Sequence, residues 1–348
     1  MSIVLFILGL AILIRGSDFF VGSAAFIAKH FGVSKLIIGL TLVSMGTSLP
    51  ELGTSVYASA TDKGGIAVGN VVGSNIANIA LVLGVCLLLR QITVKRKMLT
   101  RDGVIMLAVS FLFTFFVFWG VERWEGLILI AIFIAYLLFL YRQNKDEKKS
   151  EALSKVIEEG IERDRRLSRE VAKLIIENKE VTKKEAKSRV IKAEKDEKRR
   201  LAKEIAKLVF GCLGVIVGAW LLVEMAVNIF KGTGISQTVI GSTLIAFGTS
   251  VPELAVSVVA ILKRFEDISI GNIIGSNIFN ILLVIGAAAL VKDLTVDNKN
   301  MLLFTNIPIM LLVAGLLLIF MALKGRLKRW EGGVFVAIYV LFLVLNYW

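Results

Sequence analysis

The sequence predicts an all-α polytopic membrane protein. Ten transmembrane helices are expected to form two inverted-topology five-helix repeats, with a cytoplasmic helical hairpin inserted between the halves. Three observations lead to this fold class. The 348-residue chain is 56% hydrophobic and contains apolar runs of about 20 residues, enough to cross a hydrocarbon core of about 30 Å. One polar motif occurs twice within these runs, and a long charged stretch separates the two copies.

The apolar runs define the individual predicted spans. In chain order they cover residues 2–28, 36–60, 66–89, 102–120, 124–142, 208–230, 236–262, 268–291, 300–322 and 331–347. The first run has no basic segment before it and no clear small-residue cleavage site. It is therefore expected to stay in the protein as a helix and not to act as a signal peptide.

The net charge is +13, and the basic residues between the spans gather in loops that share one side of the membrane if the spans alternate. These loops contain Lys29, Lys35, Arg90, Lys95, Arg96, Lys97, Arg101, Lys263, Arg264, Lys324, Arg326, Lys328 and Arg329. By the positive-inside rule this side is cytoplasmic, which places both termini outside the cell membrane. The charge pattern is thus explained by the lipid bilayer, and no nucleic-acid partner is expected.

The charged stretch between the fifth and sixth spans divides the chain into three predicted parts. Residues 1–142 form the first membrane half, 143–207 a charged hairpin and 208–348 the second half. Apolar residues recur at helical spacing in the hairpin, and Thr182 with Glu185 forms a capping box that would restart a helix. By the charge rule the hairpin is cytoplasmic. A solvated connector is the favoured interpretation, and a regulatory or partner-binding module, its partner unknown, is the alternative.

The two membrane halves contain the same motif. IGLTLVSMGTSLPEL (38–52) matches IGSTLIAFGTSVPEL (240–254), and VGNVVGSNIANI (68–79) matches IGNIIGSNIFNI (270–281), both at a shift of 202 residues without a gap. A register kept over more than forty residues indicates a duplicated unit. Because each unit holds five spans, the second copy must enter the membrane in the opposite orientation, which is an arrangement typical of secondary transporters.

A proline and a glutamate stand together near the middle of one span in each half. Pro50 and Pro252, two of only three prolines in the chain, precede Glu51 and Glu253. Each proline is expected to break its helix and to free backbone carbonyls, such as those from Ser44 to Thr47. Freed carbonyls and charged side chains are tolerated inside a membrane only where they face protein, water or an ion. The pattern predicts an oxygen-rich cage for a hard cation.

Neutral oxygens accompany the glutamates. Ser74 and Asn78 share one helix face, as do Ser276 and Asn280. Calcium takes roughly six to eight oxygen ligands. The motif contains neither histidine nor cysteine, the ligands that softer metals prefer. The alternative is a structural one, in which the glutamates form a hydrogen-bonded buried pair. For the motif glycines, close helix packing is the preferred interpretation: Gly39, Gly69, Gly73, Gly271 and Gly275.

The doubled motif resembles a known family. The pattern G-T-S-[LV]-P-E, followed about twenty residues later by G-N-x-x-G-S-N, is similar to the alpha repeats of the sodium/calcium exchangers in the cation/calcium antiporter superfamily. The resemblance implies that the second, third, seventh and eighth helices enclose the ions. It also implies that the first and sixth helices are long, tilted and able to slide across that core.

The resemblance further implies a set of ion ligands. Glu51 and Glu253 would be the central carboxylates for Ca²⁺, and Thr47 and Thr249 would offer backbone carbonyls. The flanking Na⁺ sites would be formed by Ser48, Ser74, Ser250 and Ser276 with the carbonyls of Ser44 and Ala246. Asn78 and Asn280 would border the centre, and this chain has an amide at both positions where some prokaryotic relatives have one aspartate.

The expected function is secondary active antiport of Na⁺ against Ca²⁺ by alternating access. Neither enzymatic activity nor a cofactor is expected, since the ions are the cargo. The nearest alternative is an H⁺/Ca²⁺ antiporter, in which one of the glutamates titrates. A passive cation channel is less favoured because an inverted repeat within one chain is typical of a carrier. A membrane scaffold with a merely structural ion site is a third alternative.

Overall fold

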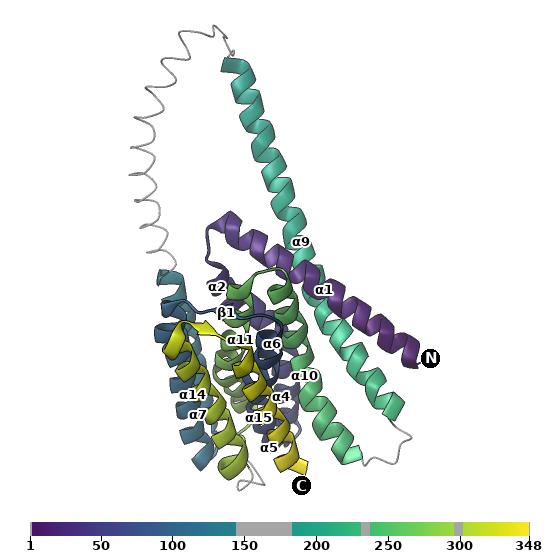
Figure 1. Ribbon diagram of the computed structural model, residues 1–348, viewed down its shortest axis with the longest axis vertical. Helices are drawn as coiled ribbons and strands as arrows, with labels where there is room; N and C mark the ends of the chain where they lie inside the picture. Colours follow the sequence, from purple (N-terminus) through teal and green to yellow (C-terminus); the bar gives the residue numbers. More distant parts are fainter. Residues whose placement is uncertain (1, 144–182, 231–236, 296–301, 348) are drawn as a thin grey trace.

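The protein is built almost wholly of helices (Figure 1). The computed structural model describes residues 2–143, 183–230, 237–295 and 302–347. The N-terminal part contains α1 (Ser2–Phe31), α2 (Lys35–Ile38), η1 (Gly39–Val43), α3 (Ser44–Thr47), α4 (Leu49–Ala60), α5 (Gly64–Ile76), η2 (Ala77–Leu83), α6 (Gly84–Leu89), β1 (Ile92–Thr93), η3 (Met98–Gly103), α7 (Val104–Trp119) and a helix over Arg123–Gln143. The C-terminal part contains α9 (Lys183–Phe230), α10 (Gln237–Leu262), α11 (Glu266–Phe279), η4 (Asn280–Ile285), α12 (Gly286–Val291), η5 (Leu302–Asn306), α14 (Ile307–Lys324), β2 (Arg326–Leu327) and α15 (Arg329–Tyr347).

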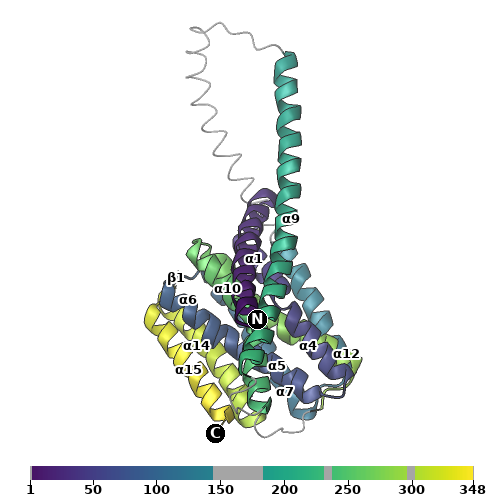
Figure 2. The same cartoon turned by 90° about the vertical axis from the view of Figure 1, so that its right-hand side faces the viewer.

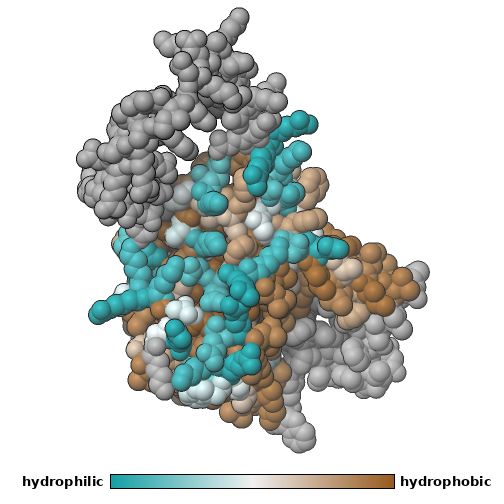
Figure 3. All heavy atoms as spheres, turned by 45° about the horizontal axis from the view of Figure 1, so that its top comes forward, coloured by the Kyte–Doolittle hydropathy of each residue, from teal (hydrophilic) through white to brown (hydrophobic). Residues whose placement is uncertain are grey.

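Several of these helices can cross a membrane. In the described ranges, 7 helices are long and apolar enough, or 8 if the bent pair Lys35–Thr47 and Leu49–Ala60 is one span. Figure 3 shows hydrophilic residues gathered on the end of the bundle from which α9 projects and hydrophobic residues on its flanks. Apart from Ser48 and Gly120, the described residues of the predicted windows are helical. The chain is a multi-pass membrane protein.

The two spans that carry the second part of the motif form the centre of the bundle. The apolar windows of α5–α6 and α11–α12 are 83% buried, whereas those of the other spans are between 28% and 44% buried. α11 packs on η1 and α3, and α4 packs on α5 and α12. Helices α7, α14 and α15 lie on the opposite side of the bundle from α1 and α9 (Figures 1 and 2). Small residues such as glycine, serine and asparagine allow this central packing.

Helices α1 and α9 form a separate pair beside the bundle (Figure 1). Glycines allow their backbones to touch where they cross: a β-carbon at Gly16 would lie 2.7 Å from the backbone nitrogen of Val215, and one at Gly218 would lie 2.5 Å from that of Leu13. Close packing of the two backbones therefore contributes to the association of α1 with α9 in lipid.

Helix α9 differs from the prediction. It runs for 48 residues without interruption from the charged stretch into the membrane, so no helix end marks the predicted boundary between residues 207 and 208. The reason is local: residues 183–210 contain neither glycine nor proline and are rich in lysine, glutamate and alanine, which are good helix formers. The first arm of the predicted hairpin and Thr182 lie outside the described residues.

Contacts between the N- and C-terminal parts come in matched pairs. Strand β1 pairs with β2, and Val121 forms a bridge with Leu294. The sequence Arg-Trp-Glu-Gly opens both the helix at residues 123–126 and α15 at 329–332, a repeat at a shift of 206 that lies outside the doubled motif. Nη2 of Arg123 donates to the carbonyl of Val291, and Nη2 of Arg329 donates to the carbonyl of Leu89, both at 3.2 Å. Each part thus caps a helix of the other.

The π-helical segments recur in the same way. η2 and η4 occupy equivalent positions in the second part of the motif, and η3 and η5 both lie at the start of the following span. π-Helical turns inside α-helices are rare and are often found near functional sites. At these segments the duplication extends to backbone geometry, whereas η1 has no π-helical counterpart in α10.

Candidate functional site

The two motif glutamates lie in the centre of the bundle. Glu51 on α4 and Glu253 on α10 are both 0% exposed. The hydroxyl of Ser48, at the start of α4, donates to Oε1 of Glu253 at 2.9 Å and so links the two helices directly. The two glutamates occupy equivalent positions of the duplicated motif, and this hydroxyl reaches from one copy to the glutamate of the other.

The first motif helix bends at the predicted position. The segments before and after Ser48 differ in direction by 48°, and Ser48 itself has φ −91° and ψ 11°, outside the helical range. Pro50 has no amide hydrogen, so the carbonyl of Gly46 receives no helical hydrogen bond from it. This carbonyl instead lies 3.9 Å from the Cys212 thiol, a weak contact. The prediction that the Ser44 carbonyl is freed is wrong, because it accepts from the amide of Ser48 at 3.0 Å.

The second motif helix does not break. Helix α10 is continuous from Gln237 to Leu262 with Pro252 inside it, so the expectation of a second break is wrong. A proline removes one hydrogen bond and crowds one carbonyl, and a helix that is packed within a membrane bundle can absorb both without ending. The two copies of the motif therefore have different backbone geometries despite their nearly identical sequences.

Many buried polar atoms in the two copies of the motif have no hydrogen-bond partner among the described residues. They are both carboxylate oxygens of Glu51, Oε2 of Glu253, both amide atoms of Asn78, Oδ1 of Asn280, and the hydroxyls of Ser250 and Ser276. Leaving a buried polar group unpaired costs about 1–3 kcal/mol, and more for a charged one. Such a concentration of unsatisfied oxygens in the bundle centre fits a bound cation, which would satisfy several of them at once.

Two matched bridges connect the motif helices across the halves. The amide nitrogen of Asn70 donates to Ser55 at 3.0 Å, and its oxygen accepts from Thr249 at 3.4 Å. The counterparts are equivalent: Asn272 donates to Ser257 at 3.1 Å and accepts from Thr47 at 3.1 Å. Each asparagine thus joins a serine of its own half to a threonine of the other.

The sequence prediction did not assign a role to these asparagines. Both stand in the duplicated G-N-x-x-G-S-N pattern, so the repetition itself was the signal that could have found them. Asn75 and Asn277 were missed in the same way. Nδ2 of Asn280 donates to Oδ1 of Asn75 at 3.1 Å, and Nδ2 of Asn75 lies 3.4 Å from the carbonyl of Asn277.

The structure places the other predicted site residues as follows. Ser74 lies 3.4 Å from the Thr249 hydroxyl, which again joins the halves. Thr47 and Ser44 are fully buried, and the Ser44 hydroxyl donates to the carbonyl of Leu40 at 2.9 Å. Ala246 belongs to α10, but its side chain lies outside the described part of the structure.

The donor set is made of oxygens. Among the described residues, no group of three or more histidine, cysteine, aspartate or glutamate side chains could hold a metal, so an ion at this site meets two carboxylates and otherwise neutral oxygens. Hard cations such as Ca²⁺ and Na⁺ prefer such ligands, whereas softer metals prefer nitrogen or sulfur. The oxygens that these side chains offer are therefore of the type that a hard cation binds.

Comparisons with known proteins agree with this chemistry. Residues 1–142 and 203–348 match the protein family described as "Sodium/calcium exchanger protein". The chain belongs to this family. It is a multi-pass membrane antiporter of the sodium/calcium exchanger type.

Relatives cover the whole length of this exchanger. It is 39% identical to the "Sodium/calcium exchanger MaX1" of Methanosarcina acetivorans, over 100% of this chain and 99% of the relative. It is 32% identical to the "Putative antiporter CaxA" of Alkalimonas amylolytica, over 93% and 90%. A solved structure of the sodium-calcium exchanger NCX_Mj superimposes with a TM-score of 0.77 at 30% identity, over 99% of this chain and 98% of that one. These matches support cation/Ca²⁺ exchange.

Proposed function

We propose that this exchanger moves Ca²⁺ against Na⁺ through the site formed by Glu51 and Glu253. One observation carries the proposal: two fully buried carboxylates from the two copies of the motif lie together, and three of their four oxygens have no partner among the described residues. An ionised carboxylate at this depth is costly unless a cation neutralises it. The names of MaX1 and NCX_Mj, both sodium/calcium exchangers, point to the same pair of ions.

Each of the predicted ligands has a place in this proposal. The carboxylates and the carbonyls of Thr47 and Thr249 hold Ca²⁺. Sodium ions are held by the same carboxylates together with Ser44, Ser48, Ser74, Ala246, Ser250 and Ser276, while Asn78 and Asn280 border the centre. The unpartnered hydroxyls of Ser250 and Ser276 and the amide of Asn78 support this set, because they have free lone pairs.

Charge explains why the ions exclude each other. Two carboxylates carry a charge of about −2 when ionised, which one Ca²⁺ or two Na⁺ neutralise. When the site is loaded, its charge is neutralised and the protein can change the side of the membrane to which the site opens. An empty site bears two unpaired charges in a low-dielectric region, which opposes this change. Competition for the shared carboxylates therefore couples the ions. In the alternative H⁺/Ca²⁺ antiporter, protons take the place of Na⁺ on the same carboxylates.

We infer that residues 1–142 and 208–348 are inverted five-helix repeats with ten spans in total. The matched contacts of Arg123 with Val291 and of Arg329 with Leu89 support this arrangement, because each half repeats the other's role. The termini then lie outside, and the charged stretch over 143–207 lies in the cytoplasm, as the basic loops predict.

A difference between the halves supports alternating access. A β-carbon at Gly271 would lie 2.7 Å from the carbonyl of Leu36, and one at Gly275 would lie 2.7 Å from that of Leu40, so this side of the site is tightly packed. At the equivalent glycines of the other half, Gly69 and Gly73, the described structure places no atom within 4 Å. Backbone atoms thus close the side of Gly271 and Gly275, whereas no described atom meets a β-carbon on the side of Gly69 and Gly73. An exchange of these two geometries between the halves would move access from one side of the membrane to the other.

Calcium uptake into proteoliposomes tests the proposal. With Na⁺ loaded inside, external Ca²⁺ should enter and uptake should stop when the Na⁺ gradient is removed. A proton gradient alone should drive no uptake. Uptake driven by protons would favour the H⁺/Ca²⁺ antiporter, and uptake with neither gradient would indicate a channel.

The site itself is tested by Glu51→Gln combined with Glu253→Gln. We expect Ca²⁺ binding, measured by calorimetry in detergent, to weaken by about 100-fold or more, because each lost charged ligand contributes roughly 1.5–3 kcal/mol. The matched control is Glu224→Gln, which neutralises an exposed glutamate on α9 and should leave binding unchanged. Unchanged Ca²⁺ binding and exchange in the double variant would contradict the proposal.

A further inference from the structure

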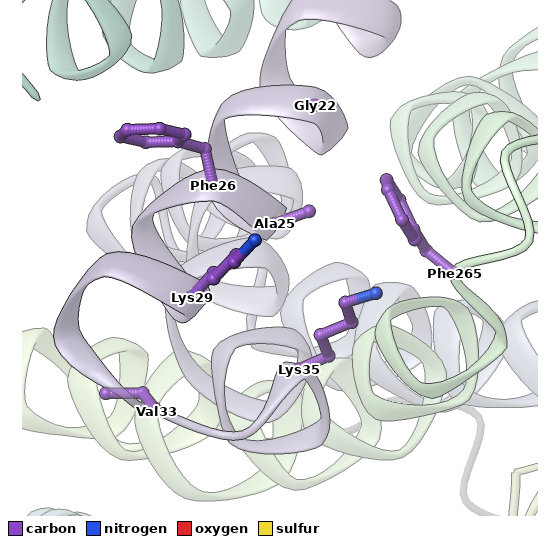
Figure 4. Close-up of a pocket in the computed structure, with 7 residues that line it drawn as sticks. All are labelled: Gly22, Ala25, Phe26, Lys29, Val33, Lys35 and Phe265. Atoms are coloured by element: carbon purple, nitrogen blue, oxygen red, sulfur yellow. The ribbon is translucent and has the colours of Figure 1, made fainter. Parts of the chain in front are cut away.

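A basic cavity lies outside the ion site, where α1 ends. It has a volume of about 460 Å³ and is lined by Gly22, Ala25, Phe26, Lys29, Val33, Lys35 and Phe265 (Figure 4). Its walls are α1, the start of α2 and the turn between α10 and α11. None of the lining residues is acidic. The cavity therefore combines two ammonium groups with apolar and aromatic walls.

The two lysines are available to an anion. Figure 4 shows both side chains extending into the space between α1 and Phe265. Nζ of Lys35 lies 4.2 Å from the centre of the Phe265 ring, a contact that holds the side chain in place but leaves its N–H groups free to donate. Within the described part of the chain, neither Lys29 nor Lys35 forms an ion pair.

The neighbouring acidic groups are already engaged. Asp18 pairs with Lys263 at 2.8 Å, and Glu204 pairs with Lys207 at 2.7 Å and accepts a hydrogen bond from Ser23 at 2.9 Å. A further cation is near, since the guanidinium of Arg200 on α9 lies 5.0 Å from the centre of the Phe26 ring. The local charge at the cavity is therefore positive.

The position of the cavity favours a lipid. Lys29 and His30 stand in the last turn of the apolar helix α1, so the cavity lies at the level where a membrane span meets the headgroups. Apolar surface continues from it: Phe31 at its end is 49% exposed, and Phe19, on the same face of α1 as Phe26, is 47% exposed. An acyl chain can follow α1 while its headgroup occupies the cavity. A free inorganic phosphate would use only the lysines.

We propose that this cavity binds the phosphate-bearing headgroup of an anionic phospholipid between Lys29 and Lys35. The phosphate accepts hydrogen bonds from both ammonium groups, and the glycerol lies against Ala25 and Phe265. Basic pockets between membrane helices bind anionic headgroups by this chemistry. A bound lipid would join the end of α1 to the turn between α10 and α11, beside the ion pair of Lys263 with Asp18.

Native mass spectrometry of the full chain in detergent tests the proposal. Phosphatidylglycerol is the anionic probe and phosphatidylcholine the zwitterionic one. In Lys29→Gln/Lys35→Gln, the dissociation constant for phosphatidylglycerol should rise by about tenfold or more, and phosphatidylcholine binding should not change. The control Arg96→Gln/Arg326→Gln removes the same charge from exposed residues with no place in the cavity and should change phosphatidylglycerol binding by less than about twofold.

Two further arms complete the test. Lys29→Arg/Lys35→Arg keeps both charges and should bind phosphatidylglycerol as the original chain does, which separates loss of charge from misfolding. Equal effects of the cavity and control substitutions would overturn the proposal. So would displacement of phosphatidylglycerol by millimolar inorganic phosphate, since the site would then be one for free phosphate. All these readouts measure binding and are independent of ion exchange.

Discussion

At the residue scale, the ion site is supported by amide side chains that both donate and accept. Asn70 and Asn272 each use their nitrogen within one half and their oxygen toward the other. An asparagine suits this role because its two ends have opposite hydrogen-bonding character. The threonines they hold, Thr249 and Thr47, are the residues proposed to present carbonyls to Ca²⁺. We infer that the asparagines position these ligands and do not bind the ion themselves.

A double-mutant cycle tests this role. Thr47→Val and Asn272→Ala should be coupled by about 0.5–1.5 kcal/mol in the free energy of unfolding, because they remove the two ends of one buried hydrogen bond. The control cycle combines Thr47→Val with Asn70→Ala, whose partner is Thr249. Its coupling should be close to zero. Equal coupling in both cycles, measured by denaturant unfolding in detergent, would contradict the assignment.

The sequence was sufficient to predict the site's charged centre but not its hydrogen bonds. A glutamate next to a proline in the middle of a span, found twice, leaves few interpretations other than a functional one, and the structure buries both acids completely. Partner choice was not predictable, because duplication identifies equivalent positions but not which side chains meet. Asn280 donates to Asn75, whereas its equivalent, Asn78, has no partner among the described residues.

At the element scale, the crossing of α1 and α9 depends on backbone contact. Neither helix is enclosed by the bundle, and glycines at the crossing bring the two backbones together. In lipid, where no hydrophobic effect drives helices together, close packing is the main source of their association. The family resemblance implies that these two helices slide across the core. A rigid pair can move as one body, so we expect the contact to matter for exchange as well as for stability.

Gly16→Ala tests this contact. The new β-carbon would lie 2.7 Å from the backbone nitrogen of Val215 and 2.8 Å from the backbone carbon of Gly214, which cannot yield as a flexible side chain would. We expect a loss of about 1–3 kcal/mol in the free energy of unfolding. The control is Gly315→Ala in α14, where no described atom lies within 4 Å, and a gain of about 0.5–1 kcal/mol is expected there from helix propensity. A similar gain at Gly16 would show that the crossing is loose.

Helix positions were predicted more reliably than helix continuity. Apolar length alone located the seven or eight described helices that can cross a membrane, since hydropathy is set by the bilayer and not by the neighbouring helices. Continuity depends on local packing. Pro50 and Pro252 have the same sequence surroundings, yet one helix bends by 48° and the other runs through. The π-helical turns were also beyond prediction, because they arise from how the helices fit together.

At the scale of the whole molecule, the two halves share a sequence pattern but differ in conformation. β-Carbons at Gly271 and Gly275 would meet backbone atoms at 2.7 Å, while no described atom lies within 4 Å of β-carbons at their equivalents, Gly69 and Gly73. If the halves exchange these geometries during transport, backbone atoms must come to lie against Gly73 as those of Leu40 now lie against Gly275. By the shift of 202 residues, the carbonyl that would meet Gly73 belongs to Ser242, the equivalent of Leu40.

Gly73→Leu should therefore separate ion binding from ion movement. In the present conformation no described atom lies within 4 Å of a β-carbon at Gly73, so Ca²⁺ affinity measured by calorimetry should stay within about twofold. Closure of that side would force the leucine against backbone, at a cost of about 1–3 kcal/mol, and exchange in proteoliposomes should slow by roughly ten- to hundredfold. Gly315→Leu, which adds the same side chain in α14, should leave both unchanged. A channel has no need to close one side before opening the other, so normal Ca²⁺ flux through Gly73→Leu would argue against alternating access.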